Sequence, residues 1–125
     1  MKLTIFPNAK AHPKTKAEKS KNATLCTYGE VVDLSDGDVE DLFEIVTNNA
    51  WSQSIFKNNY RSNESFISCD TMVADIDTGL RMDEAIKRLK TAKISALVAP
   101  SPSHTEEEHK FRIIIPLVES ITAGS

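Results

Sequence analysis

The back half of the chain constrains the fold most, because its apolar residues follow a strand, helix, strand, strand pattern. The apolar run that closes residues 66–76 is typical of a buried strand. Residues 82–91 are expected to form a helix, with acidic residues in the first turn and basic residues in the last, as the helix dipole favours. Its apolar residues recur at helical spacing: Met82, Ala85, Ile86 and Leu89. Two shorter apolar segments, 94–99 and 111–118, predict two further strands.

This order of elements predicts a defined sheet edge. If the helix forms a right-handed crossover, the strands before and after it are parallel, and their carboxyl ends open on the same edge. If the 111–118 strand then pairs antiparallel through the 100–110 loop, its first residues begin at that edge as well. Polar residues near both strand ends are therefore expected to lie close together.

The front half carries a weaker pattern, and its elements are expected in this order: a short strand at 3–6, a loop or mobile arm at 7–22, a strand at 24–28, a helix at 36–48, and an irregular connection at 51–64 with a short helix around 52–56. Only the 36–48 helix shows a sustained period, which rests on Val39, Leu42, Phe43 and Val46. Ser35 is its expected N-cap, and Asp38 favours the positive helix end. The whole chain is therefore expected to have an α+β fold.

Length and apolar content fit one domain with a buried core, since the chain has 125 residues of which 40% are apolar. No apolar run approaches the roughly 18 residues that span a membrane, and the first residues lack the apolar block of a secretory signal. We therefore expect a cytoplasmic protein with no membrane partner. Cys26 and Cys69 form no CxxC pair, so reduced, structural thiols are expected.

Charge is distributed unevenly, although the net charge is only −3. Residues 1–25 contain six lysines and one glutamate, whereas residues 30–44 contain seven acidic residues and no basic one. The sequence predicts a basic N-terminal arm or loop with a short strand at 1–22, followed by one domain at 23–125. Such an arm can touch a phosphate backbone, although a lysine-rich segment that is merely solvated is the alternative.

Two aspartates follow each other closely at the end of the 66–76 strand. Asp75 and Asp77 are one residue apart, so in a strand they project from the same face, roughly 6 to 7 Å from each other. Carboxylates that close repel unless a cation lies between them, and hard oxygen ligands suit Mg²⁺ or Mn²⁺. These ions orient and neutralise phosphates in phosphoryl or nucleotidyl transfer. Two aspartates that simply meet water at a strand end are the alternative.

The predicted sheet edge adds partners for a phosphate. Ser103 and His104 follow the 94–99 strand, and Arg112 opens the 111–118 strand. A guanidinium binds phosphate in a bidentate manner, while hydroxyl and imidazole groups donate single hydrogen bonds. A nucleoside triphosphate needs this combination: carboxylates for its metal ion and donors for its phosphate tail. His109 and the acidic residues 106–108 are instead expected to form a solvated loop.

The combination resembles the catalytic domain of archaeo-eukaryotic-type primases, in particular the primase-polymerases of phages and plasmids. The family's first motif is an apolar strand that ends in Asp-x-Asp, matched here by residues 72–77. The second is a small residue, any residue and His after another strand, matched by Pro102, Ser103 and His104. Residues 111–116 look like the strand that follows in the phage members. The resemblance covers about residues 50–118.

The resemblance implies roles for these residues. Asp75 and Asp77 would bind the catalytic Mg²⁺ or Mn²⁺, and His104, helped by Ser103, would contact the phosphates of the incoming nucleotide. Lys57 and Arg61 would touch template or nucleotide. The implied partners are nucleoside triphosphates and a single-stranded DNA template, in the cytoplasm of a bacterial or phage-infected cell.

The chain departs from the family at its end. Such primases carry a third acidic motif on a later strand, and their recognition-motif-like sheet runs strand, helix, strand, strand, helix, strand. Here only Glu119 follows the third strand, so the last helix and strand are not present. We therefore expect the N-terminal part of a larger replication protein, or a short relative, with little polymerase turnover on its own. The rest of that protein, or a second copy of the chain, is the expected partner.

Two other functions stay open at this point. The segment Asp75 to Leu80 is similar to the nucleophile motif of haloacid-dehalogenase-type phosphatases, in which Asp75 would attack phosphorus and Asp77 would act as general acid. A non-enzymatic fragment that binds nucleic acid or a replication partner through its basic arm and its exposed sheet edge is the third possibility.

Overall fold

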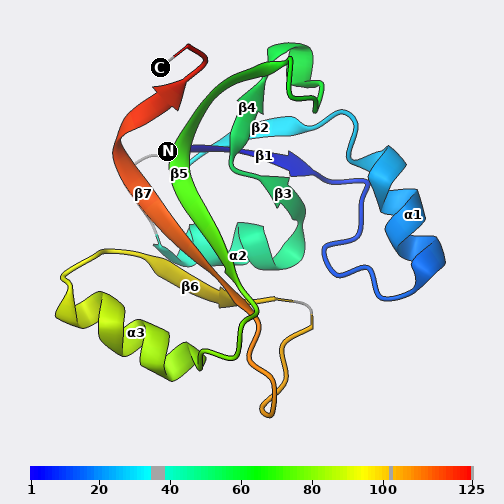
Figure 1. The fold of residues 1–125 in the computed structure, drawn as a ribbon. Coiled ribbons are helices and arrows are strands. Elements are labelled where there is room, and N and C mark those ends of the chain that lie inside the picture. The colour runs from blue at the N-terminus through cyan, green and yellow to red at the C-terminus, as the bar shows by residue number, and fades with distance from the viewer. Residues whose placement is uncertain (35–38, 102, 125) are drawn as a thin grey trace. The chain divides into compact units, whose positions relative to one another are not determined.

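The structure is a computed structural model that describes residues 1–34, 39–101 and 103–124 (Figure 1). Its elements are β1 (Lys2–Phe6), α1 (Lys16–Leu25), β2 (Glu30–Asp33), α2 (Val39–Asn48), β3 (Ala50–Ser52), β4 (Ser54–Phe56), the short 3₁₀ helix η2 (Lys57–Asn59), β5 (Phe66–Ile76), α3 (Met82–Thr91), β6 (Leu97–Pro100) and β7 (Phe111–Thr122). In the described ranges they form an α+β arrangement with two antiparallel sheets and three α-helices. No helix in these ranges is long and apolar enough to cross a membrane.

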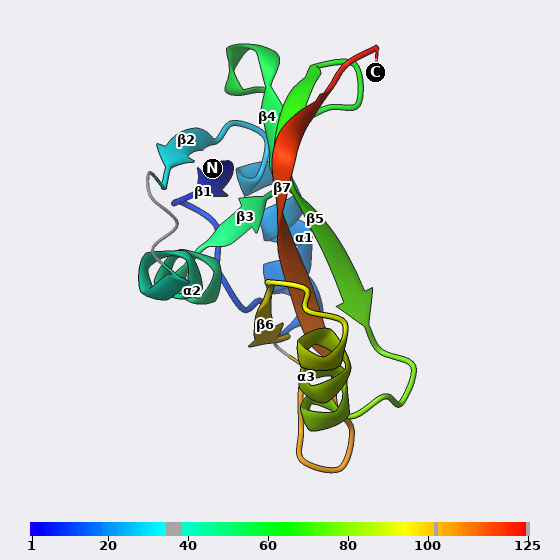
Figure 2. The same ribbon diagram turned by 90° about the vertical axis from the view of Figure 1, so that its left-hand side faces the viewer.

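The chain divides into two compact units, Met1–Asp70 with Val118–Ser125, and Thr71–Leu117. The first unit contains a sheet of order β2-β1-β3, in which β1 is the central strand (Figure 2). Because β1 pairs on both sides, its side chains supply much of the core: Leu3, Thr4 and Phe6 are buried. β4 pairs antiparallel with the first part of β5, and the Thr4 hydroxyl donates to the Ser54 carbonyl oxygen at 2.7 Å.

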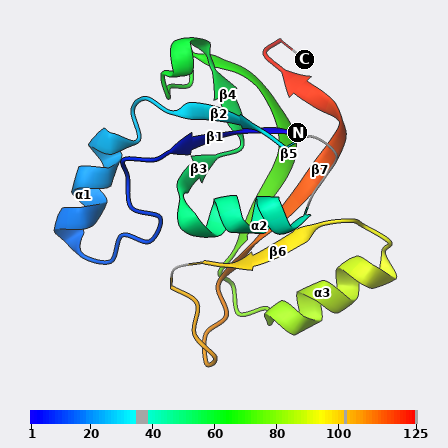
Figure 3. The same cartoon turned by 180° about the vertical axis from the view of Figure 1, so that it is seen from behind.

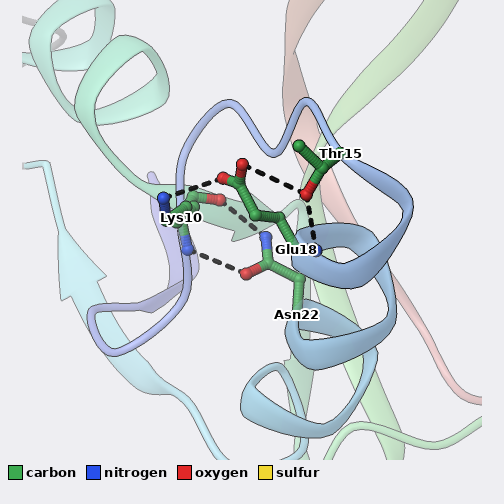
Figure 4. Close-up of polar contacts among 4 residues, drawn as sticks. All are labelled: Lys10, Thr15, Glu18 and Asn22. Atoms are coloured by element: carbon green, nitrogen blue, oxygen red, sulfur yellow. Dashed lines mark hydrogen bonds and ion pairs between the residues drawn. The ribbon is translucent and has the colours of Figure 1, made fainter.

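Helix α1 is held by polar contacts rather than by a buried face, since none of its residues is buried. The Thr15 hydroxyl accepts from the Glu18 amide and caps the helix, and Lys10 Nζ lies 2.7 Å from Glu18 (Figure 4). The Asn22 side chain bonds both the amide and the carbonyl of Lys10, so it ties the preceding loop to the helix. The prediction of a loop or mobile arm at 7–22 is therefore wrong for its second half, because α1 begins at Lys16.

The second unit contains α3, β6 and the adjoining parts of β5 and β7. The strand order is β5-β7-β6, so β7 lies between the two strands that α3 connects, and α3 lies beside β6 (Figures 1 and 3). β6 and β7 are antiparallel, with Ala99 opposite Arg112 and Pro100 opposite Phe111. Residues of β5 contact residues of β7 in reverse order: Asp75 contacts Arg112, Asp70 contacts Ser120, and Ile67 contacts Ala123, the residue after β7. β5 and β7 are therefore antiparallel. β5 and β6 therefore run parallel on either side of β7, as the sequence predicts.

The strand predicted at 3–6 and the long elements of the back half match their predictions, whereas two short elements of the front half do not. β5 and α3 have the predicted bounds, and β6 and β7 lie within three or four residues of theirs. The expected strand at 24–28 is wrong, because α1 extends through Leu25 and the strand begins at Glu30. The expected short helix at 52–56 is also wrong, since β3 and β4 occupy this stretch. The expected cap residues Ser35 and Asp38 lie outside the described residues.

Asp70 joins three strands of the first unit. Its carboxylate accepts from the Ser120 hydroxyl and, at 2.8 Å, from the Lys2 backbone amide. The hydrogen bond from Ser120 is the main cause that lowers the pKa of Asp70 below its ordinary value of 3.8, helped by the Lys2 amide and the N-terminal amino group. A carboxyl group with a lowered folded-state pKa adds stability above its unfolded-state pKa and loses it as the pH falls through the folded-state value.

We expect Asp70→Asn to lower the free energy of unfolding at pH 7 by about 1 to 2 kcal/mol, the size of one or two hydrogen bonds to a charged group near the surface. The difference from the parent protein should narrow from about pH 4 downward, because the parent then loses the same contribution. Urea unfolding of both proteins between pH 7 and pH 2.5 measures this. A difference that stays constant with pH would show that the Asp70 charge contributes nothing.

Candidate functional site

The end of β5 and the start of β7 bring one carboxylate and one guanidinium together in the second unit. Arg112 Nε donates to Asp75 Oδ1 at 2.8 Å, and Arg112 lies opposite Ala99 on β6. The sequence predicts this juxtaposition, and the structure confirms it. The side chains are 70% exposed for Asp75 and 38% for Arg112, so the ion pair contributes at most about 1 kcal/mol. A pair this weak can be rearranged by a ligand at little cost.

Asp77 is the first residue after β5 and is exposed, as Asp75 is. No group of three or more His, Cys, Asp and Glu side chains that could hold a metal occurs in the part of the chain that the structure describes. Mg²⁺ is commonly bound by only one or two carboxylates together with water and substrate phosphates. Two exposed carboxylates, one of which already accepts from Arg112, fit a cation that arrives with a phosphate.

Ser103 and His104 belong to the loop that joins β6 to β7. The Ser101 amide donates to the Lys110 carbonyl at 2.8 Å, which extends the strand pairing one step into the loop. His104 is half-buried, and its Nδ1 lies 3.1 Å from both the amide nitrogen and the carbonyl oxygen of Lys110. Nδ1 thus has a main-chain partner in either neutral tautomer, so Lys110 fixes the ring orientation. Ser103 is exposed, and Pro102 lies outside the described residues.

His109 does not lie in a solvated loop, as the sequence suggests, but caps a helix. Its Nδ1 accepts from the Met82 amide at 2.8 Å, at the start of α3, where the N-cap residue Arg81 makes no side-chain cap. The His109 ring also lies against the His104 ring, with 4.7 Å between centroids. Among the described residues, His104 forms no hydrogen bond or ion pair with Asp75 or Asp77. His109 therefore connects the loop that carries His104 to the start of α3.

We expect His109→Ala to lower the free energy of unfolding by about 1 kcal/mol, because the Met82 amide then loses its acceptor. The surface substitution His12→Ala is the matched control and should change stability by less than about 0.5 kcal/mol. Chemical denaturation of the three proteins measures the effect. Equal stability of His109→Ala and the parent would mean that water caps α3 as well as the imidazole does.

The two cysteines are poor candidates for chemistry. Both are free thiols, and burial is the main cause that raises the pKa of each above 9.0. A raised pKa keeps the thiol protonated at neutral pH and unreactive. The prediction of structural thiols agrees with this.

No family model, no curated protein and no solved structure matches this chain.

Proposed function

We propose that the second unit binds a nucleoside triphosphate together with a divalent cation, as the first part of a primase-polymerase-type nucleotidyltransferase. The observation that carries the proposal is the Asp75–Arg112 pair at the sheet edge, with Asp77 two residues from Asp75. Negative and positive side chains next to each other are what a metal-bound triphosphate requires. The resemblance of residues 72–77 and 102–104 to two primase motifs supports the same reaction class.

In this proposal Asp75 and Asp77 hold Mg²⁺ or Mn²⁺ that the triphosphate brings. The ion, when bound, neutralises charge on the phosphate oxygens. Arg112 keeps Asp75 oriented before the ligand arrives and then donates to a phosphate, since its exposed ion pair is weak. His104, oriented by Lys110, and Ser103 donate to the phosphate tail. Each of these roles uses a side chain on one sheet edge or on the loop next to it.

Two carboxylates bind a metal-nucleotide complex but are one ligand short of the primase set. We therefore propose that this chain alone binds nucleotide without making primers. The third carboxylate would come from the remaining part of a replication protein or from a second copy of the chain. The nucleic acid that directs synthesis would be a single-stranded DNA template.

Calorimetric titration with a deoxynucleoside triphosphate, with and without Mn²⁺, tests the proposal. We expect binding that requires Mn²⁺ and falls about tenfold or more in Asp75→Asn and in Asp77→Asn. Glu30→Gln, which removes one exposed carboxylate in the first unit, is the control and should bind like the parent. Binding that is equal in all four proteins would contradict the proposal.

Two activity assays separate the alternatives. Hydrolysis of a phosphomonoester that is abolished by Asp75→Asn would favour the dehalogenase-type phosphatase. Primer synthesis by the chain alone would show that two carboxylates suffice, and that the third ligand is not needed.

A further inference from the structure

Tyr28 and Tyr60 form an exposed aromatic pair in the first unit. Their ring centroids are 5.4 Å apart at an interplanar angle of 53°, and the residues are 67% and 42% exposed. Aromatic rings usually gain stability by being buried, and exposed rings offer faces on which nucleic-acid bases can stack. The pair lies within residues 1–70 and shares no residue with the proposed triphosphate site.

The main chain holds both rings in place. Tyr28 and Tyr60 form an isolated antiparallel bridge, flanked by hydrogen bonds from Gly29 to Asn59 at 3.0 Å and from Arg61 to Thr27 at 2.8 Å. Gly29, which follows Tyr28, is packed closely against β1. A Cβ on Gly29 would lie 2.4 Å from Thr4 Cγ2 and 2.8 Å from the Ile5 carbonyl oxygen. The rings are therefore presented by a backbone that is already fixed, which reduces the entropy lost on binding.

A positive charge lies next to the rings. Arg61 Nε donates to the Cys26 carbonyl oxygen at 2.7 Å, so a main-chain group rather than a carboxylate orients the guanidinium. Neither Arg61 nor Lys57 forms an ion pair in the described part of the chain. Both cations thus keep their charge available for an anionic ligand.

A polar cavity adjoins this arginine. Its volume is about 630 Å³, and its polar lining consists of Arg61, Ser52, Ser54, Ser62 and Asn63. No carboxylate lines it, and hydroxyl, amide and guanidinium groups are donors for phosphate oxygens. Its volume falls in the range of small-molecule sites and accommodates a nucleotide unit.

We infer that Tyr28, Tyr60 and Arg61 form a binding surface for single-stranded nucleic acid. The two rings stack on unpaired bases, and Arg61 with the serines and asparagine of the cavity binds backbone phosphate. Stacking on rings does not depend on base identity, so the surface accepts many sequences. A duplex, whose bases are already stacked on each other, binds more weakly.

Fluorescence anisotropy with a labelled twelve-nucleotide oligothymidylate, at low salt and without divalent cations, tests the inference on the full chain. We expect Tyr28→Ala and Tyr60→Ala each to weaken binding about 5- to 100-fold, the range of one lost stacking contact. Tyr28→Phe and Tyr60→Phe keep the ring and should bind within about twofold of the parent. Phe43→Ala is the matched control, because Phe43 is 43% exposed on α2 and lies outside the surface.

Arg61→Gln should weaken binding and reduce its salt dependence, since one phosphate contact is lost. Circular dichroism of each variant establishes that it is folded, and the phenylalanine variants separate loss of stacking from loss of structure. The anisotropy assay contains neither a divalent cation nor a nucleoside triphosphate, so this inference and the triphosphate site are tested independently. Binding that is insensitive to both tyrosines, equal binding to duplex, or no binding at low salt would overturn the inference.

Discussion

Replacing Phe111 by alanine is expected to lower the free energy of unfolding by about 3 to 5 kcal/mol. Phe111 is fully buried, is the first residue of β7 and lies opposite Pro100. Removing its ring deletes a large apolar surface from the core and leaves a cavity that the neighbouring strands can only partly close. For a domain whose total stability is about 5 to 15 kcal/mol, this is a large fraction.

Urea unfolding measures this effect, with Phe43→Ala as the control. Phe43 is the same residue type on an exposed helix face, and its removal should cost less than about 1 kcal/mol. Phe111 also precedes Arg112, so the loss of the ring should weaken Mn²⁺-dependent nucleotide binding under conditions where the variant is still folded. Equal stability losses in the two variants would show that the start of β7 is not part of the core.

Gly29→Ala is expected to destabilise the first unit by about 1 to 3 kcal/mol, because the new methyl group would overlap Thr4 Cγ2 and the Ile5 carbonyl oxygen. The backbone oxygen cannot move without disturbing β1, the central strand of its sheet. The same shift would move Tyr28, so oligonucleotide binding should fall together with stability.

A double-mutant cycle makes this prediction specific. Thr4→Ser removes the Cγ2 methyl group but keeps the hydroxyl that donates to the Ser54 carbonyl. The double variant Gly29→Ala with Thr4→Ser should therefore be more stable than the sum of the two single effects implies. Strict additivity would contradict a steric cause at Thr4, and an unaltered stability of Gly29→Ala would contradict the close approach itself.

The sequence best predicts the elements that carry a clear pattern of apolar residues. α3 and β5 are predicted at their observed bounds, because α3 has one apolar stripe and β5 ends in an apolar run. α1 escapes prediction because it has no buried residue and depends on Lys10, Thr15 and Asn22 for its stability. β3 and β4 have three residues each, too few for a period of two to be visible.

Some residues of the candidate sites are also predictable from the sequence, and others are not. Asp75 and Arg112 are predicted to meet because strand order and direction place them at one edge, and their 2.8 Å contact confirms this. His109 is missed, since capping of a helix 27 residues away leaves no local signal. Tyr28 and Tyr60 are missed for the same reason: their pairing depends on a bridge between distant segments. Gly29 is a weak local signal, because a glycine next to Tyr28 lets the backbone come close to a neighbouring strand.

The most direct test of the triphosphate site locates the metal. Substoichiometric Mn²⁺ broadens amide NMR signals of the residues nearest to it, and the spectrum can be recorded with and without a deoxynucleoside triphosphate. We predict that the signals of Asp75, Asp77, Ser103 and Arg112 lose most intensity, and that they do so only when the nucleotide is present. Broadening centred on the acidic segment 30–44, or broadening that the nucleotide does not change, would contradict the account.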